Sequence, residues 1–234
     1  MVQKVKAVFF DMGGTLVYDV GFEEALSRNL ASFVEEKLGL RVEREKVLSL
    51  WNGVGDSWRD VELWDLARAM LFLRKLGATP RPVLAEGLYA RVLESYVEGF
   101  RLEPCAEEVF SKLKEMGLLL GVITNVGSYE IVSRRLAEVG LLDYVDVLVA
   151  SQAFGWRKPS EEIFRVACWL AGQEPSMCVH VGDDPVADVL GAKKVGIRAI
   201  QVLRVAKYRS DSADAYVNSV SEVPSVVRSW LSSE

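Results

Sequence analysis

Histidine and cysteine are scarce in this chain, whose 234 residues include one histidine and three cysteines. The cysteines, Cys105, Cys168 and Cys178, lie far apart and lack the paired spacing of zinc ligands, which argues against a zinc site built on thiolates. We interpret them as free, buried thiols in a reducing compartment, and we expect the protein to be cytoplasmic.

Long hydrophobic runs and an excess of positive charge are also missing. No apolar run approaches the roughly 18 residues of a membrane span, and the first residues lack the pattern of a secretory signal. The 28 Lys and Arg residues face 33 Asp and Glu residues, which gives a net charge of −5. Since the basic residues form no stripe, we expect neither a nucleic acid nor a membrane as a partner.

Short β-rich runs alternate with helical patterns through much of the chain. Several runs are apolar almost throughout, as strands covered on both faces of a parallel sheet should be. Strands that alternate with helices predict right-handed crossovers and a doubly wound parallel sheet of the α/β class. The predicted strands are residues 4–12, 118–124, 145–150, 177–182 and 198–203, with a short strand near Tyr216 and a final helix from about Pro224.

The segment between the first and second predicted strands has helical patterns only. Residues 18–100 contain no convincing strand, and their apolar spacing predicts helices over 22–38, 42–51, 57–76 and 82–98. We therefore predict a core domain of residues 1–17 and 101–234 and a helical cap domain of residues 18–100. Because α/β folds bind ligands at the carboxyl edge of the sheet, we interpret the insertion after the first strand as a lid.

Polar residues follow several of the predicted strands. The carboxyl ends of parallel strands meet at one edge of a sheet, so we expect these side chains to converge. Several carboxylates gathered without a cation would repel one another, and an oxygen-rich site with few ligands suits Mg²⁺. The residues that follow strands are Asp11, Thr124, Asn125, Asp183 and Asp184, with Asp188 shortly behind. Lys158, which stands just before a predicted helix, is expected to join them.

Three nearby residues have structural interpretations. Asp184 precedes Pro185, the arrangement of an N-cap followed by proline at the first helical position. Asp188 lies one turn into that helix, and because helix side chains lean toward the N-terminus it can reach a supporting position. His180, the single histidine, alternates with valines in a buried strand, and we predict a structural role for it.

With these motifs in this order, nearly the whole chain resembles the haloacid dehalogenase-like hydrolase superfamily. It is similar to the branch that has a helical cap between the first and second motifs. The residues that carry the resemblance are Asp11, Gly14, Thr15, Leu16, Thr124, Asn125, Lys158, Pro159, Gly182, Asp183 and Asp188.

The resemblance implies a role for each motif. Asp11 would be the nucleophile that forms an aspartyl-phosphate, and Lys158 would neutralise the developing charge. Phosphoryl oxygens would bind to Thr124 and to the amide of Asn125. Mg²⁺ would be bound by Asp11, by Asp183 and by the backbone carbonyl of Gly13, with Asp188 and Asp184 in support.

Gly13 departs from the pattern of the family's phosphatases, which carry a second aspartate there. That aspartate protonates the leaving group and later activates water, which is typically worth about 10²- to 10⁴-fold in rate. A glycine keeps the carbonyl but lacks the proton-transfer group. A cap carboxylate such as Glu23 or Asp56 could substitute, although nothing in the sequence selects one.

The sequence therefore favours a Mg²⁺-dependent phosphatase acting on a small phosphorylated metabolite, either slow or limited to good leaving groups. A dehalogenase or phosphonatase is an alternative, because halide departs without a proton and phosphonatases use a cap lysine. Lys37, Lys46 and Lys75 are the available cap lysines, but Asp183 and Asp188 argue against the dehalogenase. A third alternative is a non-catalytic module that binds metal and phosphate. We expect a monomer or a homodimer.

Overall fold

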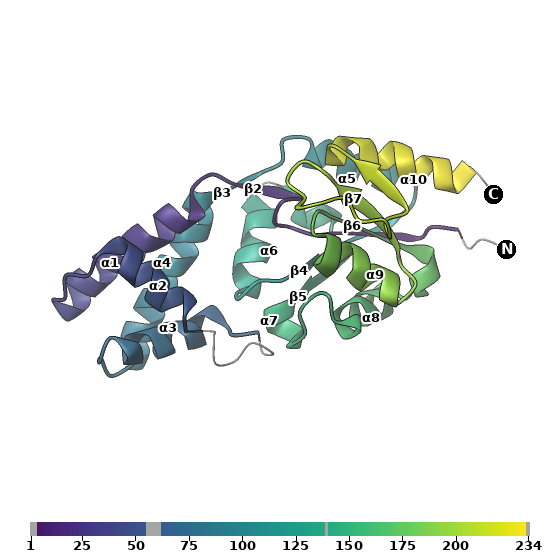
Figure 1. Cartoon of the computed structure of the whole chain (residues 1–234). Helices are drawn as coiled ribbons and strands as arrows, with labels where there is room; N and C mark the ends of the chain where they lie inside the picture. The colour runs from purple at the N-terminus through teal and green to yellow at the C-terminus, as the bar shows by residue number, and fades with distance from the viewer. Residues whose placement is uncertain (1–3, 55–61, 139, 233–234) are drawn as a thin grey trace. The chain divides into compact units, whose positions relative to one another are not determined.

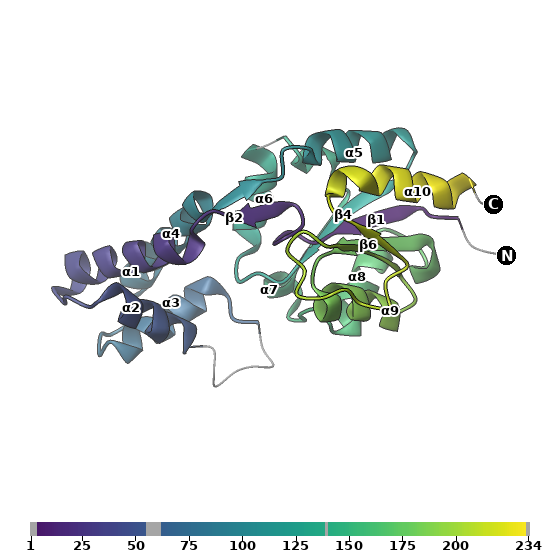
Figure 2. The same cartoon turned by 45° about the horizontal axis from the view of Figure 1, so that its top comes forward.

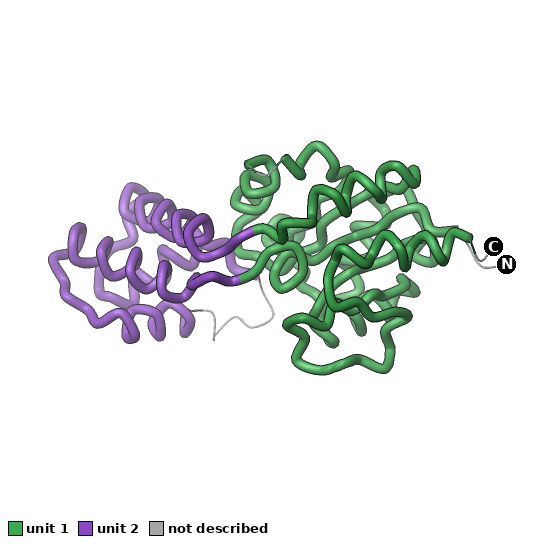
Figure 3. Tube along the Cα trace, turned by 90° about the horizontal axis from the view of Figure 1, so that it is seen from above, with its two compact units in different colours: residues 1–18, 102–234 green, residues 19–101 purple. Residues whose placement is uncertain are grey.

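The computed structural model describes residues 4–54, 62–138 and 140–232. The chain divides into two compact units, residues 1–18 with 102–234 and residues 19–101 (Figure 3). It leaves the first unit through strand β2 (Val17–Asp19) and returns through strand β3 (Phe100–Leu102), and these two strands pair with each other. Among the described helices, none has the length and apolar character that a membrane span requires.

Six parallel strands form the sheet of the first unit, in the order β5-β4-β1-β6-β7-β8 (Figure 1). This order confirms the doubly wound α/β prediction. The chain builds outward from β1 first on one side and then on the other, so the topology switches at β1, the strand that Asp11 follows. The strands are β1 (Ala7–Phe10), β4 (Leu119–Thr124), β5 (Val147–Ala150), β6 (Cys178–Gly182), β7 (Arg198–Val202) and β8 (Ala215–Val217).

Helices cover both faces of this sheet (Figure 2). On one face Phe10 of β1 stacks on Phe110 of α5, with 5.0 Å between ring centroids. On the other face Phe9 belongs to a buried cluster that includes Phe164 of α8. The helices of the unit are α5 (Ala106–Glu115), α6 (Tyr129–Glu138), α7 (Ser151–Phe154), α8 (Glu161–Leu170), α9 (Gly191–Lys194) and α10 (Val223–Ser232). Short helical turns are η2 (Leu142–Tyr144), η3 (Pro175–Met177), η4 (Pro185–Leu190) and η5 (Val220–Glu222).

The second unit consists of helices with their own apolar core. Its helices are α1 (Phe22–Leu38), α2 (Arg44–Asn52), α3 (Asp65–Lys75) and α4 (Pro82–Gly99). Pro82 occupies the first turn of α4, where a missing N–H costs nothing. Trp51 packs edge-on against Phe72, with 5.7 Å between ring centroids, inside a cluster with Leu30, Phe33 and Leu88.

Two expectations for the insertion need correction. The interval 18–100 was expected to lack strands, but β2 and β3 occupy its two ends. Three-residue strands are too short to show a period of two, and their partners lie far apart in sequence. The helix expected over 57–76 begins at Asp65, because Trp64 is extended (φ −57°, ψ 134°) and residues 62–64 are not helical. Residues 57–61 lie outside the described part of the chain.

Candidate active site

Asp11 is held at the end of β1 by the backbone. Its N–H donates to the carbonyl oxygen of Val181 at 2.8 Å, which extends the pairing of β1 with β6 by one residue. The chain then turns through Gly14, whose φ is +77°. A Cβ on Gly14 would lie 2.7 Å from the carboxylate of Asp183. Glycine there allows both the left-handed turn and the close approach of Asp183.

Lys158 lies between two carboxylates. Its Nζ donates to Oδ1 of Asp11 and to Oδ1 of Asp188, each at 2.6 Å, and the residue is 5% exposed. The loop that carries it is fixed by Asn125, whose Nδ2 donates to the Lys158 carbonyl at 3.0 Å and whose Oδ1 accepts from the Lys158 N–H at 2.8 Å. Both ends of the Asn125 side-chain amide are therefore held by the Lys158 backbone.

The turn after β6 holds the other carboxylates. Asp184 caps the π-helical turn η4, since its Oδ1 accepts from the N–H groups of Val186 and Ala187, both at 2.8 Å. Capping was the function predicted for Asp184 from Pro185. Oδ2 of Asp188 accepts from the Asp184 N–H at 3.0 Å, so both oxygens of Asp188 are engaged by protein donors.

These residues line one cavity of about 240 Å³ in the first unit. Its lining contains every candidate site residue named from the sequence, together with Ala187. The strand ends converge as expected, because β4, β1 and β6 are neighbours in a parallel sheet. The lining residues are Asp11, Gly13, Thr124, Asn125, Lys158, Asp183, Asp184, Ala187 and Asp188.

Burial and mutual repulsion shift the ionisation of this cluster. Burial raises the pKa of Asp11 to about 7, against the opposing attraction of Lys158. Burial together with the charge of Asp188 raises the pKa of Asp183 to about 6. Burial alone would lower the pKa of Lys158, but the two carboxylates beside it outweigh that effect, so the pKa lies above its ordinary value. Lys158 is therefore a fixed cation, whereas Asp11 and Asp183 are carboxyls that lack enough positive charge nearby.

The donor set fits a hard divalent cation. Oxygens of Asp11, Asp183 and Asp188 all lie within 4.8 Å of one another. Asp11 and Asp183 are the two whose pKa is raised, so a cation would relieve an existing repulsion. The carbonyl oxygen of Gly13 accepts no backbone hydrogen bond from the described residues. The two carboxylates and this carbonyl are oxygen ligands, as Mg²⁺ and Ca²⁺ prefer.

Gly13 leaves room for a side chain. A Cβ built on it meets no atom within 4 Å, and its φ is outside the left-handed region. The backbone therefore does not require glycine here, in contrast to Gly14. The missing proton-transfer group is a chemical difference and is not imposed by the turn.

Two contacts were not foreseen from the sequence. One is the pairing of the Asn125 side chain with the Lys158 backbone, which no sequence pattern signals. The other is the contact of His180 with Asp188, at 3.0 Å between Nε2 and Oδ1. The burial predicted for His180 is confirmed. Strand alternation could have indicated the contact, because His180 and Gly182 share a face of β6 and Gly182 abuts Asp188.

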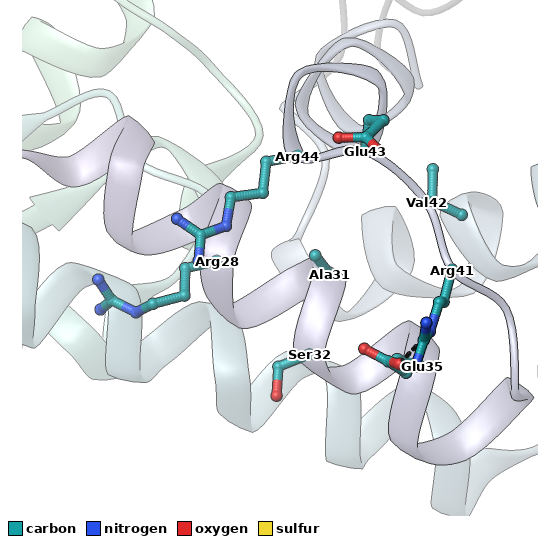
Figure 4. Close-up of a pocket in the computed structure, with 8 residues that line it drawn as sticks. All are labelled: Arg28, Ala31, Ser32, Glu35, Arg41, Val42, Glu43 and Arg44. Atoms are coloured by element: carbon teal, nitrogen blue, oxygen red, sulfur yellow. Dashed lines mark hydrogen bonds and ion pairs between the residues drawn. The ribbon is translucent and has the colours of Figure 1, made fainter.

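The insertion has a cavity of its own, of about 430 Å³ (Figure 4). It is lined by arginines and glutamates of α1, α2 and the segment between them, and Arg41 donates to Glu35 at 2.7 Å. Of the cap lysines, Lys75 donates to the Gly53 carbonyl at 2.6 Å, while Lys37 and Lys46 are exposed on helix surfaces. Glu23 is exposed in the first turn of α1, and Asp56 lies outside the described residues.

Residues 5–196 match the model of the haloacid dehalogenase-like hydrolase family. The chain belongs to this family. A glyceraldehyde 3-phosphate phosphatase of Methanocaldococcus jannaschii is 26% identical over 96% of this chain and 97% of that protein. A ribulose-1,5-bisphosphate 5-phosphatase of Halopiger xanaduensis is 34% identical over 52% of this chain, and the match spans 51% of that relative's length.

The crystal structure of a 2-haloacid dehalogenase from Pseudomonas syringae has a TM-score of 0.82 with this chain, at 25% identity over 97% of this chain and 99% of that one. The haloacid dehalogenase-like family of hydrolases thus includes relatives described as phosphatases and as dehalogenases. The described structure has the family's sheet with helices α1–α4 inserted after β2.

Proposed function

We propose that the protein is a Mg²⁺-dependent phosphatase that hydrolyses a small phosphorylated metabolite through an aspartyl-phosphate on Asp11. The observation that carries the proposal is the position of Lys158, whose Nζ lies 2.6 Å from Asp11 in the cavity that also contains Thr124 and Asp183. A fixed cation beside a buried carboxylate attracts a phosphoryl group to the nucleophile. The match with a phosphatase over nearly the whole chain supports the same activity.

In this proposal a carboxylate oxygen of Asp11 attacks phosphorus, and the bond between phosphorus and the leaving-group oxygen breaks. Thr124 Oγ1 and the Asn125 N–H donate to phosphoryl oxygens, while Lys158 balances their charge. The leaving group takes its proton from water, because Gly13 supplies none. Water then attacks the phosphorus of the acyl phosphate, which releases inorganic phosphate and restores the Asp11 carboxylate.

Asp11, Asp183 and the Gly13 carbonyl would hold Mg²⁺, which supplies a positive charge next to the phosphoryl group when it is bound. Without a cation, the raised pKa of Asp11, about 7, keeps part of the nucleophile protonated near neutral pH. Metal binding would thus be coupled to deprotonation of the nucleophile.

The test is a phosphate-release assay with and without Mg²⁺ on p-nitrophenyl phosphate and a panel of sugar and triose phosphates. We expect release that requires Mg²⁺ and disappears in Asp11→Asn. The matched control is Asp143→Asn, which removes an exposed carboxylate outside the cavity. Absence of turnover across the panel, with inorganic phosphate still bound, would favour the non-catalytic alternative.

A dehalogenase is the second candidate, for one specific reason. Halide departs without a proton, so the missing group at Gly13 would not slow that reaction, and a 2-haloacid dehalogenase resembles this chain over 97% of its length. The retained pair of Asp183 with Asp11 favours the phosphatase, since the dehalogenase reaction does not need a metal. Halide release from 2-chloropropionate without Mg²⁺ would reverse this preference.

A further inference from the structure

The carboxylate of Asp188 contacts both Lys158 and His180, the single histidine of the chain. His180 is 1% exposed, and its Nε2 is 3.0 Å from Oδ1 of Asp188. The same oxygen accepts from Nζ of Lys158 at 2.6 Å, and that ammonium also donates to Asp11 at 2.6 Å. A continuous chain of buried polar contacts therefore runs from the imidazole to the nucleophile.

The sheet fixes the imidazole in this orientation. His180 pairs in register with Phe9 of β1 and Ala199 of β7, and its ring meets Phe164 of α8 edge-on with centroids 5.2 Å apart. Gly182 lies two residues further on the same face, where a Cβ would be 2.2 Å from Cγ of Asp188. The absence of that Cβ lets Asp188 lie against β6 within reach of the imidazole.

The hydrogen bond to Asp188 also determines which ring nitrogen of His180 carries the proton. A carboxylate oxygen only accepts, so the neutral ring carries its hydrogen on Nε2. Nδ1 is buried and has no hydrogen-bond partner among the described residues. An apolar side chain would fill this position without leaving a buried acceptor unsatisfied. A purely structural role therefore does not explain why a histidine stands here.

We propose that His180 is a positioning residue, which holds Asp188 so that Lys158 is shared between Asp188 and the nucleophile Asp11. This inference rests on the proposed function for the roles of Lys158 and Asp11. Oδ1 of Asp188 accepts hydrogen bonds from Lys158 and from His180. The bond from His180 weakens the attraction of Asp188 for the Lys158 ammonium. Without the imidazole N–H, Asp188 would draw Lys158 away from Asp11, and less positive charge would face the phosphoryl group.

The first test compares His180→Leu with His180→Gln in Mg²⁺-dependent hydrolysis of p-nitrophenyl phosphate. Glutamine places an amide N–H near the position of Nε2, while leucine supplies no donor. We expect His180→Leu to lower kcat by about 10- to 100-fold with KM unchanged, the size of effect seen for groups that orient a site residue. His180→Gln should recover most of kcat.

Thermal unfolding separates positioning from folding. His180→Leu should unfold at the same temperature as the wild type or higher, since it removes the unsatisfied Nδ1. Wild-type kcat in His180→Leu would overturn the proposal. Equal losses of kcat in the two variants, with unchanged unfolding temperatures, would overturn it as well.

A spectroscopic test is independent of turnover. Because the chain has one histidine, an untagged ¹⁵N-labelled sample gives the imidazole signals of His180 alone. We expect a protonated Nε2 and an unprotonated Nδ1, with the Nε2 signal shifted in Asp188→Asn. The opposite tautomer would overturn the proposal.

If the wild type hydrolyses no substrate, the proposed function is refuted. The positioning role of His180 is then tested by a binding measurement. Inorganic phosphate is then the probe. His180→Leu must bind it more weakly than His180→Gln does, because Lys158 would be drawn from the phosphate site. Equal phosphate affinity in the two variants would overturn the positioning role.

Discussion

The side chain of Asn125 pairs with both backbone groups of Lys158, donating to its carbonyl at 3.0 Å and accepting from its N–H at 2.8 Å. The pairing joins the end of β4 to the loop before α8, and through it Lys158 is directed at Asp11. The side chain of Asn125 thus holds the loop of Lys158, and its backbone N–H is the group that we propose to bind phosphate.

Replacing Asn125 by alanine should lower kcat by about 10- to 100-fold, because the loop that orients Lys158 loses both hydrogen bonds. The control is Asn52→Ala, which alters an exposed residue at the end of α2. Steady-state kinetics on p-nitrophenyl phosphate measures the effect. Equal kcat in Asn125→Ala and the wild type would show that Lys158 is held without this pairing.

Asp184 should prove to be a cap and not a metal ligand. Alanine at this position should reduce the free energy of unfolding by about 1 kcal/mol, because two N–H groups of η4 lose their acceptor. Asparagine, which caps equally well, should keep both the stability and the affinity for Mg²⁺. Urea unfolding and Mg²⁺ titration of the two variants check this. A large loss of Mg²⁺ affinity in Asp184→Asn would contradict it.

The stability of the metal-free protein should fall as pH rises, whereas the stabilisation by Mg²⁺ should grow. The pKa of Asp11 is raised from 3.8 to about 7 and that of Asp183 from 3.8 to about 6. Between about pH 4 and 7 the metal-free folded protein therefore holds protons that the unfolded chain releases, so its stability falls as pH rises through this window. Asp188, whose pKa is lowered, titrates below this window. Burial lowers the pKa of His180 from 6.5, so this one group opposes the trend that the two carboxyls set.

Mg²⁺ binds the deprotonated carboxyls, so it should raise Tm more at about pH 8 than at about pH 5. Thermal unfolding with and without Mg²⁺ at the two pH values measures this difference. Asp183→Asn is the matched variant and should lose most of the increment. A Mg²⁺-induced rise in Tm that is equal at both pH values would contradict the assignment of Asp11 and Asp183.

The two adjacent glycines of the first turn should respond differently to alanine. Gly13→Ala should change the free energy of unfolding by less than about 0.5 kcal/mol, because a Cβ there meets nothing within 4 Å. Gly14→Ala should be destabilised by more than 1 kcal/mol or so, since it combines φ +77° with an approach of 2.7 Å to Asp183. Similar stabilities of the two variants by urea unfolding would refute this contrast.

The strand ends and their motifs could be predicted because each apolar run stops at a polar residue, as with Phe10 and Asp11. Parallel pairing then brings Asp11, Thr124 and Asp183 to one edge, whatever the details of the loops. The same logic located the insertion, because four helical patterns stand where the second strand would otherwise follow.

The remaining features depend on contacts between distant residues. Strands β2 and β3 are three residues each and exist through their mutual pairing. The contact of His180 with Asp188 requires the turn after β6 to fold back, which Gly182 allows. The engagement of Asn125 by Lys158 joins residues 33 positions apart. Local sequence patterns carry no information about such pairings, so only the assembled sheet reveals them.

The central claim is that Asp11 transfers phosphoryl groups in a site that lacks only a proton donor at Gly13. The direct measurement is kcat/KM with Mg²⁺ for a series of aryl and alkyl phosphates, in the wild type and in Gly13→Asp. The wild type should favour aryl phosphates steeply. Gly13→Asp should raise kcat/KM for alkyl phosphates by about 10²-fold or more and change that for aryl phosphates little. An equal gain for both classes, or no gain, would contradict the account.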